Sequence, residues 1–268
     1  MVPFPTMFDA IDAFLGLPTG LIILSVLSFW ALVGFTVHRI VVPALCGPDG
    51  RRLGRFEAEV TSQIALAFGL LISFNAVWLW DRSDRVRGAI YDEAAALSRI
   101  IDDAEDLAAD GEPADAARRD EICRAVKSYA DHLVGTEWPT LSDGSTDRAR
   151  PAALTSLRAT LRVSGTDAMR AALTDAESAR DIRIRDGLEH MQPSRWGVVF
   201  LLAVLLLISI GALHGEAPRG RKLALTLVGL AVAFCFGVLF INARPFVGAY
   251  ALKPTELRNV AFRAGAER

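Results

Sequence analysis

Four long stretches of the chain contain no charged residue and no histidine, and each is between 18 and 25 residues long. An α-helix rises about 1.5 Å per residue, so about 20 residues cross a hydrocarbon core of roughly 30 Å. One soluble domain could not bury four such segments together. The pattern therefore predicts an integral membrane protein with four spanning helices, at about 19–38, 61–80, 196–213 and 223–243.

The polar region between the second and third spans has a helical period. Apolar residues recur there at intervals of three and four, as at Ile122, Val126, Tyr129 and Leu133. No alternating strand pattern is found. We expect four amphipathic helices packed as a bundle, the first of them continuing directly from the second span. The breaks between these helices are expected at 111–113, 138–145 and 163–165.

The predicted fold class is an all-α membrane protein. Its four transmembrane helices form two hairpins, with an extramembrane helical bundle between the second and third helices. The first span lacks a preceding basic residue and a cleavage site, so we expect it to stay as an anchor. The predicted parts are a first hairpin at 1–80, the bundle at 81–195, a second hairpin at 196–243 and a membrane-surface tail at 244–268.

Charge is unevenly distributed and leaves the orientation open. Residues 81–195 hold 17 of the 29 basic and 23 of the 31 acidic side chains, a net charge of −6. Both short connectors between spans are basic, which favours a cytoplasmic position for them and an outside position for the bundle. Arginines such as Arg82, Arg195 and Arg244 also flank the opposite face. The expected location is the plasma (inner) membrane.

Candidate chemistry is sparse. The chain has no phosphate loop, nucleophile elbow or zinc-protease motif, so we expect neither an enzyme nor a bound cofactor. Its three cysteines and four histidines have no metal-ligand spacing, and nothing in the charge pattern predicts nucleic-acid binding. One acidic run could either hold a divalent cation or form a solvated helix face. It comprises Asp102, Asp103, Glu105, Asp106 and Asp110.

The second span carries two distinct faces. Phe68, Asn75 and Trp78 fall on one face, where the Asn75 amide needs a partner other than lipid. This face could line a water-filled path, or Asn75 could hydrogen-bond a neighbouring helix. Ala65, Gly69 and Ser73 form a stripe of small residues, which lets another helix approach closely.

The segment after the fourth span, NARPFVGAY, is predicted to be a membrane exit. Pro245 would end the helix, Phe246 and Tyr250 would anchor at the interface, and Gly248 would permit a turn. The tail would then run along the membrane face, with Arg258 reaching acidic groups on the first bundle helix.

Several short motifs stand out in the chain: Tyr91–Leu97 (YDEAAAL), Glu137-Trp138-Pro139, Pro245-Phe246-x-Gly248, Pro254 and Leu257-Arg258. They resemble motifs of the bestrophin-like family of bacterial membrane proteins, and the resemblance covers nearly the whole chain. An acidic residue that usually stands two places before the first tail proline is replaced here by Ala243. The acidic calcium-binding segment that follows the last span of bestrophins has no match.

The resemblance implies an architecture related to oligomeric anion channels, with the bundle in the cytoplasm. The first hypothesis is therefore a homo-oligomeric pore in the lipid bilayer for chloride or another small anion. The alternative is a non-conducting membrane sensor or scaffold whose helical bundle binds a partner or ligand. The sequence features behind the first hypothesis are the Phe68/Asn75 face and the small-residue stripes.

Overall fold

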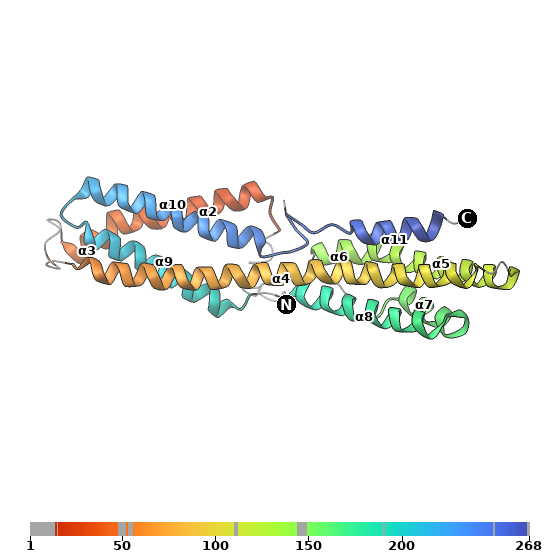
Figure 1. The fold of residues 1–268 in the computed structure, drawn as a ribbon. Helices are drawn as coiled ribbons and strands as arrows, with labels where there is room; N and C mark the ends of the chain where they lie inside the picture. The colour runs from red at the N-terminus through yellow and green to blue at the C-terminus, as the bar shows by residue number, and fades with distance from the viewer. Residues whose placement is uncertain are drawn as a thin grey trace, which may run out of the picture. The chain divides into compact units, whose positions relative to one another are not determined.

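A computed structural model describes residues 14, 16–47, 52, 56–109, 112–143, 149–189, 191–248 and 250–266, and every regular element in these ranges is a helix (Figure 1). The α-helices are α2 (Thr19–Thr36), α3 (Val42–Cys46), α4 (Ala58–Leu107), α5 (Pro113–His132), α6 (Trp138–Asp143), α7 (Ala152–Ser164), α8 (Asp167–Leu188), α9 (Pro193–Leu213), α10 (Pro218–Asn242) and α11 (Thr255–Ala266). There are also two π-helical turns. Turn η1 (Val37–Val41) joins α2 to α3, and turn η2 (Leu133–Glu137) joins α5 to α6. Helix α4 is continuous, as predicted for the second span and the first bundle helix.

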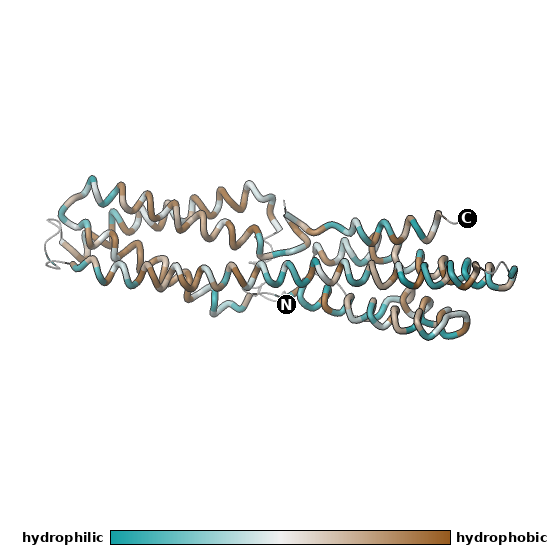
Figure 2. Tube along the Cα trace, viewed as in Figure 1, coloured by the Kyte–Doolittle hydropathy of each residue, from teal (hydrophilic) through white to brown (hydrophobic). Residues whose placement is uncertain are grey.

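The chain divides into two compact units. The first contains residues up to Trp80, His190–Arg244 and Gly248–Tyr250, and the second contains Asp81–Glu189, Pro245–Val247 and Ala251–Arg268. Four helical segments are long and apolar enough to cross a membrane, and they contain α2, the first part of α4, α9 and α10. These segments are the predominantly brown parts of Figure 2.

The first unit is held together by apolar packing. Helix α10 packs along α2 and α9. Trp30 of α2, Phe200 of α9 and Phe236 of α10 form an aromatic group, with the Phe200 and Phe236 ring centres 4.4 Å apart. Aromatic contacts of this kind add about 0.5–1.5 kcal/mol to the stabilisation from burial. Phe68 of α4 lies in the same core.

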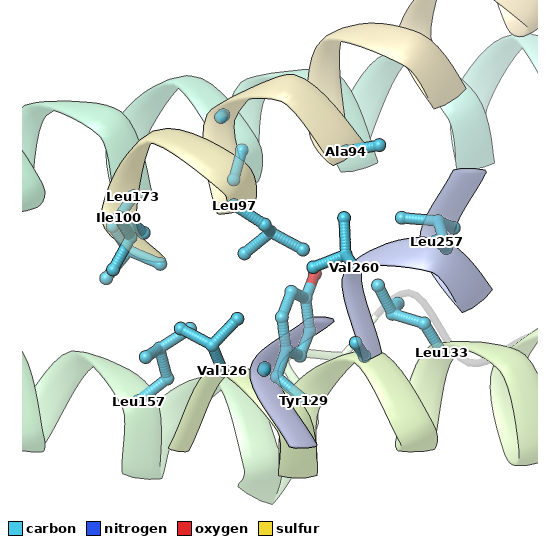
Figure 3. Close-up of a cluster of buried hydrophobic side chains, with 14 of the residues drawn as sticks. Ala94, Leu97, Ile100, Val126, Tyr129, Leu133, Leu157, Leu173, Leu257 and Val260 are labelled. Carbon is cyan, nitrogen blue, oxygen red and sulfur yellow. The ribbon is translucent and has the colours of Figure 1, made fainter. Parts of the chain in front are cut away.

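The second unit is a helical bundle with a core of its own. The core takes side chains from the polar part of α4 and from α5, α7, α8 and α11. The stripe predicted from Ile122, Val126, Tyr129 and Leu133 is fully buried. Figure 3 shows Val126, Tyr129 and Leu133 packed among apolar neighbours. The 3–4 spacing of these residues brings them to one side of α5, so burying that side removes a continuous apolar surface from water.

Both π-helical turns precede a proline. Turn η1 ends two residues before Pro43, and η2 ends two residues before Pro139. Proline has no N–H with which to continue the ladder of hydrogen bonds to the carbonyl four residues earlier. The wider π turn is a local way to keep a helical course through such an interruption.

One boundary between helices differs from the sequence-based expectations. The predicted break at 138–145 is wrong at its start, because Trp138–Asp143 form helix α6; residues 144–148 lie outside the described ranges. Helix α10 ends at Asn242, three residues before Pro245, which has no N–H to donate to the Ile241 carbonyl. The predicted turn at Gly248 is confirmed by its φ of 94°, which glycine adopts without steric penalty.

Candidate functional site

The second unit contains a group of buried polar side chains, which we call the charge cluster. It consists of Glu93 from α4, Tyr129 from α5, Glu137 from η2, and Arg180 and Arg183 from α8. All five are buried, and Glu93, Tyr129 and Arg183 have no accessible surface. Three separate segments of the sequence, namely α4, α5 with its continuation η2, and α8, therefore meet at one point in the bundle core.

The cluster is connected by charge-assisted hydrogen bonds. Arg183 Nε donates to Glu93 Oε2 at 2.8 Å, and Arg183 Nη2 donates to Glu137 Oε1 at 2.5 Å. Arg180 donates to Glu137 Oε2 from Nε at 2.9 Å and from Nη2 at 2.7 Å. Glu137 thus binds both arginines, while Arg183 binds both carboxylates. Two cations and two anions balance, which offsets part of the cost of removing each charge from water.

Tyr129 completes the coordination of Glu93. Its hydroxyl donates to Glu93 Oε1 at 2.9 Å. Burial, together with the neighbouring Glu93 carboxylate, raises the pKa of Tyr129 well above its ordinary value. The phenol therefore stays protonated at physiological pH and remains a hydrogen-bond donor to the carboxylate.

Aromatic side chains border the cluster. Arg183 lies over the ring of Trp138, 5.8 Å from its centre, and Trp138 meets Phe246 edge to face at 5.2 Å. Phe246 also packs against Gly187 of α8, where a larger residue would overlap its ring. The expectation that Phe246 anchors in the membrane interface is wrong, because its side chain is buried in the bundle unit. Of the two rings expected to anchor there, only that of Tyr250 is exposed.

The charge cluster is suited to stabilising the bundle rather than to binding a ligand. Its carboxylates already accept hydrogen bonds and are closed to solvent, so they are not free to bind a ligand. Removing one member of a buried ion pair typically costs about 3–5 kcal/mol, because the partner charge is left uncompensated. The arrangement therefore fixes the mutual positions of α4, α5, α8 and the segment around Phe246.

The tail enters the same unit. Leu257 of α11 is fully buried, and α11 packs along α5. Arg258 was predicted to reach the acidic side chains of the first bundle helix, but it is exposed. Arg263, one turn further on, makes that contact instead, at 2.5 Å from Asp102 and 2.9 Å from Glu105.

The structure also places the other residues singled out in the sequence. Trp138 is half-buried, Pro139 is exposed at the start of α6, and Pro254 is buried just before α11. Asp102, Asp103, Glu105 and Asp106 of the acidic run lie on α4, and two of these four carboxylates meet Arg263; Asp110 lies outside the described residues. Whether the tail also follows the membrane face stays a prediction.

Phe68 and Asn75 lie inside the packing of their own chain. Each is only 7% exposed, and Phe68 shares a core with Trp196 and Val199 of α9. Trp78 is half-buried and lies under the Arg195 guanidinium at 5.4 Å. Packing within the chain covers both side chains, but no hydrogen bond from Asn75 to a neighbouring helix is found among the described residues, so both interpretations of this face stay predictions.

Sequence reasoning missed Arg180 and Arg183 and did not single out Glu93. A signal for all three was present, because each lies on an apolar stripe of its helix. Glu93 falls between Ile90 and Leu97, and the arginines follow Leu173 and Ala176 at helical spacing. Charged residues of opposite sign on two core-facing stripes indicate a buried ion pair.

The helices and the comparisons define the class of protein together. Four membrane-capable helices, with an all-helical fold in the described ranges, are those of a multi-pass membrane protein. The bestrophin-like domain matches residues 26–257, nearly the whole chain, so the chain belongs to the bestrophin-like family. Comparison with curated proteins and with solved structures finds no match.

Proposed function

We propose that the protein is a homo-oligomeric, bestrophin-like pore for chloride or another small anion. Its four spans form two hairpins in the plasma (inner) membrane, and the helical bundle lies outside the bilayer. The protein works as a conduit rather than as an enzyme. Family membership and the surface of α4 support this proposal.

The observation that carries the proposal is an uncovered face along the membrane part of α4. Leu66 is 73% exposed and Leu70 is 54% exposed, and Ser73 and Val77 continue the same face. Residues at intervals of three and four lie on one side of a helix, so these four form one strip. Copies of the chain arranged around this strip would enclose a path with apolar and hydroxyl groups.

The stripe of small residues on α4 is compatible with contact between copies. A side chain added at Gly69 would meet no atom within 4 Å in its own chain, and Ser73 is exposed. The close approach predicted for this stripe is therefore open to a helix of a second copy. Small residues at such positions allow helix backbones to pack closely within a membrane.

The position of Phe68 changes the expected location of a constriction. Phe68 is turned into the core of its own chain, whereas Leu66 and Leu70 are on the uncovered strip. An apolar ring narrows the water column and gates by dewetting. In this proposal the ring consists of leucines from each copy rather than of Phe68.

Currents across planar bilayers test the proposal. Purified protein should conduct chloride, and Leu70→Ser should raise the single-channel current, because a hydroxyl lowers the barrier to water in a narrow apolar segment. Leu227→Ser is the matched control. Leu227 is 60% exposed on α10, outside the strip. The control should conduct like the original protein.

The outcome also depends on oligomeric state. A ring of copies in detergent, measured by light scattering, would support a central pore. A monomer without chloride current at any voltage or pH would overturn the proposal. Equal effects of Leu70→Ser and Leu227→Ser would overturn the assignment of the conducting face.

The alternative function is a non-conducting sensor or scaffold, and one surface feature favours it. Helices α5 and α11 border a hollow of about 380 Å³. Lys127 and Arg258 supply charge at this hollow, and Phe262 exposes most of its ring there. A partner would bind here through one aromatic contact and surrounding ion pairs. A stoichiometric partner lost with Phe262→Ser, in a protein without current, would favour this function.

A further inference from the structure

A groove in the first unit lies between α4 and α9, and its chemistry has no role in the proposed pore. Its volume is about 480 Å³. Polar groups line it from both helices, Asn75 and Trp78 from α4 and Ser194 and Arg195 from α9. We call it the α4–α9 groove.

Asn75 is the first reason to expect a ligand here. Its side chain is 93% buried, yet no hydrogen bond of its amide is found within the described ranges. Because Asn75 lines the groove, a bound group with oxygen atoms would provide the missing acceptor.

A positively charged side chain, that of Arg195, lines the same groove as this amide. The Arg195 guanidinium lies 5.4 Å from the centre of the Trp78 ring, and no ion-pair partner for it is found among the described residues. Both Ser194 and Arg195 lie in the first turn of α9, a helix of 21 residues whose start is not capped by a side chain. Pro193 has no N–H and the Arg195 N–H already donates to the Gln192 carbonyl at 3.0 Å, so the attraction of this helix start for an anion comes mainly from the helix dipole.

The remaining groove surface is apolar and open to the lipid side. Phe74 is 60% exposed and Val198 is 48% exposed, and both line the groove next to the polar groups. Trp78 and Arg195 are residue types that lie at the level of the lipid head groups. An anionic head group with an attached hydrocarbon chain matches both halves of this lining, whereas a free anion would leave the apolar half without a partner.

We propose that the α4–α9 groove binds the phosphate of an anionic membrane phospholipid. Arg195 pairs with the phosphate, the Asn75 amide donates to one of its oxygens, and the first part of an acyl chain follows Phe74 and Val198. This site goes beyond the proposed pore and does not depend on conduction. It would link the packing of α4 against α9 to the lipid composition of the membrane.

Native mass spectrometry of the full-length protein tests the site. Protein in detergent is mixed with phosphatidylglycerol or with phosphatidylcholine, and bound lipid per chain is counted. The original protein should prefer phosphatidylglycerol, and Arg195→Gln should reduce that preference roughly tenfold, as expected when a charge-assisted hydrogen bond is lost. Asn75→Leu removes a donor to the phosphate that both lipids carry, so it should reduce the binding of each lipid roughly tenfold. Arg195 is exposed, so Arg195→Gln should leave the fold intact.

Arg39→Gln is the matched control, because Arg39 is also exposed and lies 6.0 Å from the centre of an aromatic ring, that of Phe35. It should keep the preference of the original protein. Equal losses in Arg39→Gln and Arg195→Gln would overturn the site in favour of general charge attraction. Inorganic phosphate is added as a competitor in a separate arm. Displacement of the lipid by millimolar phosphate, with no lipid preference left, would assign the groove to a free anion and overturn the proposed occupant.

Discussion

Arg183 Nε and Glu93 Oε2 are 2.8 Å apart, both side chains are closed to solvent, and 90 residues of sequence separate them. This contact connects α8 to α4 in the interior of the bundle. Glu137 extends the contact to η2 through the second nitrogen of the same guanidinium. One arginine therefore determines how three segments of the chain are positioned.

Glu93→Gln should destabilise the protein strongly. The substitution leaves Arg183 buried with only one carboxylate, which costs about 3–5 kcal/mol of unfolding free energy. Thermal unfolding of the purified protein in detergent measures the loss. The matched control is Arg99→Gln, which removes the exposed ion pair with Asp175 at 2.7 Å. An exposed pair contributes about 0–1 kcal/mol, so equal effects of the two substitutions would contradict a central role of the cluster.

Gly187→Ala should also destabilise the bundle. The added methyl group would overlap the Phe246 ring, and overpacking of this kind typically costs about 1–3 kcal/mol. Adding Phe246→Leu to Gly187→Ala should recover part of the loss, because leucine vacates the space of the ring edge. Gly88→Ala on α4 is the control. No atom lies within 4 Å of its added methyl, so it should be neutral or stabilising by up to about 1 kcal/mol.

Tyr129 should make stability depend on alkaline pH. Its pKa is raised in the folded protein, so its contribution is complete below the pKa of the unfolded chain, about 10. The contribution is lost as the pH rises from there through the folded value, because the unfolded phenol releases its proton first. The free energy of unfolding, measured between pH 8 and 11, should decline more steeply for the original protein than for Tyr129→Phe. If the two proteins lost stability in parallel over this pH range, titration of Tyr129 would be excluded as the cause of the loss.

Arg263→Gln should loosen α11, whereas Arg258→Gln should have little effect. Arg263 binds Asp102 and Glu105, and the hydrogen bonds that it donates to these carboxylates raise its pKa. The arginine is partly exposed, so the expected loss is about 0.5–1 kcal/mol. Amide hydrogen exchange of Thr255–Ala266 measures it. Faster exchange in Arg258→Gln than in Arg263→Gln would reverse the assignment.

Much of the candidate site could be found from short motifs, but not its contacts. The segments around Glu93, Glu137 and Phe246 were picked out by resemblance, and the structure brings all three to one part of the bundle. Their partners on α8 were missed, because an arginine within a charged helix looks like any solvated residue when only composition is considered. The positions of Arg180 and Arg183 on the apolar stripe would have identified them.

The incorrect prediction that Arg258, rather than Arg263, contacts the acidic side chains of α4 has a similar origin. Both arginines lie on the short helix α11, and sequence alone does not say which of its sides faces α4. Burial of Leu257, Val260 and Ala264 against the bundle settles the rotation of α11. That rotation directs Arg263 to the acidic run and leaves Arg258 exposed.

The sequence by itself determined the number of apolar helices, their approximate limits and the helical nature of the region between them. These properties follow from local patterns. The length of an uncharged stretch and an apolar period of three to four residues can each be recognised within a single segment of the sequence. Only the tertiary structure decided that Phe68 and Asn75 face their own chain, that Phe246 is buried beside Trp138, and that Arg183 meets two carboxylates. Such contacts depend on how each helix is rotated against its neighbours, and that rotation results from the packing of all the helices at once.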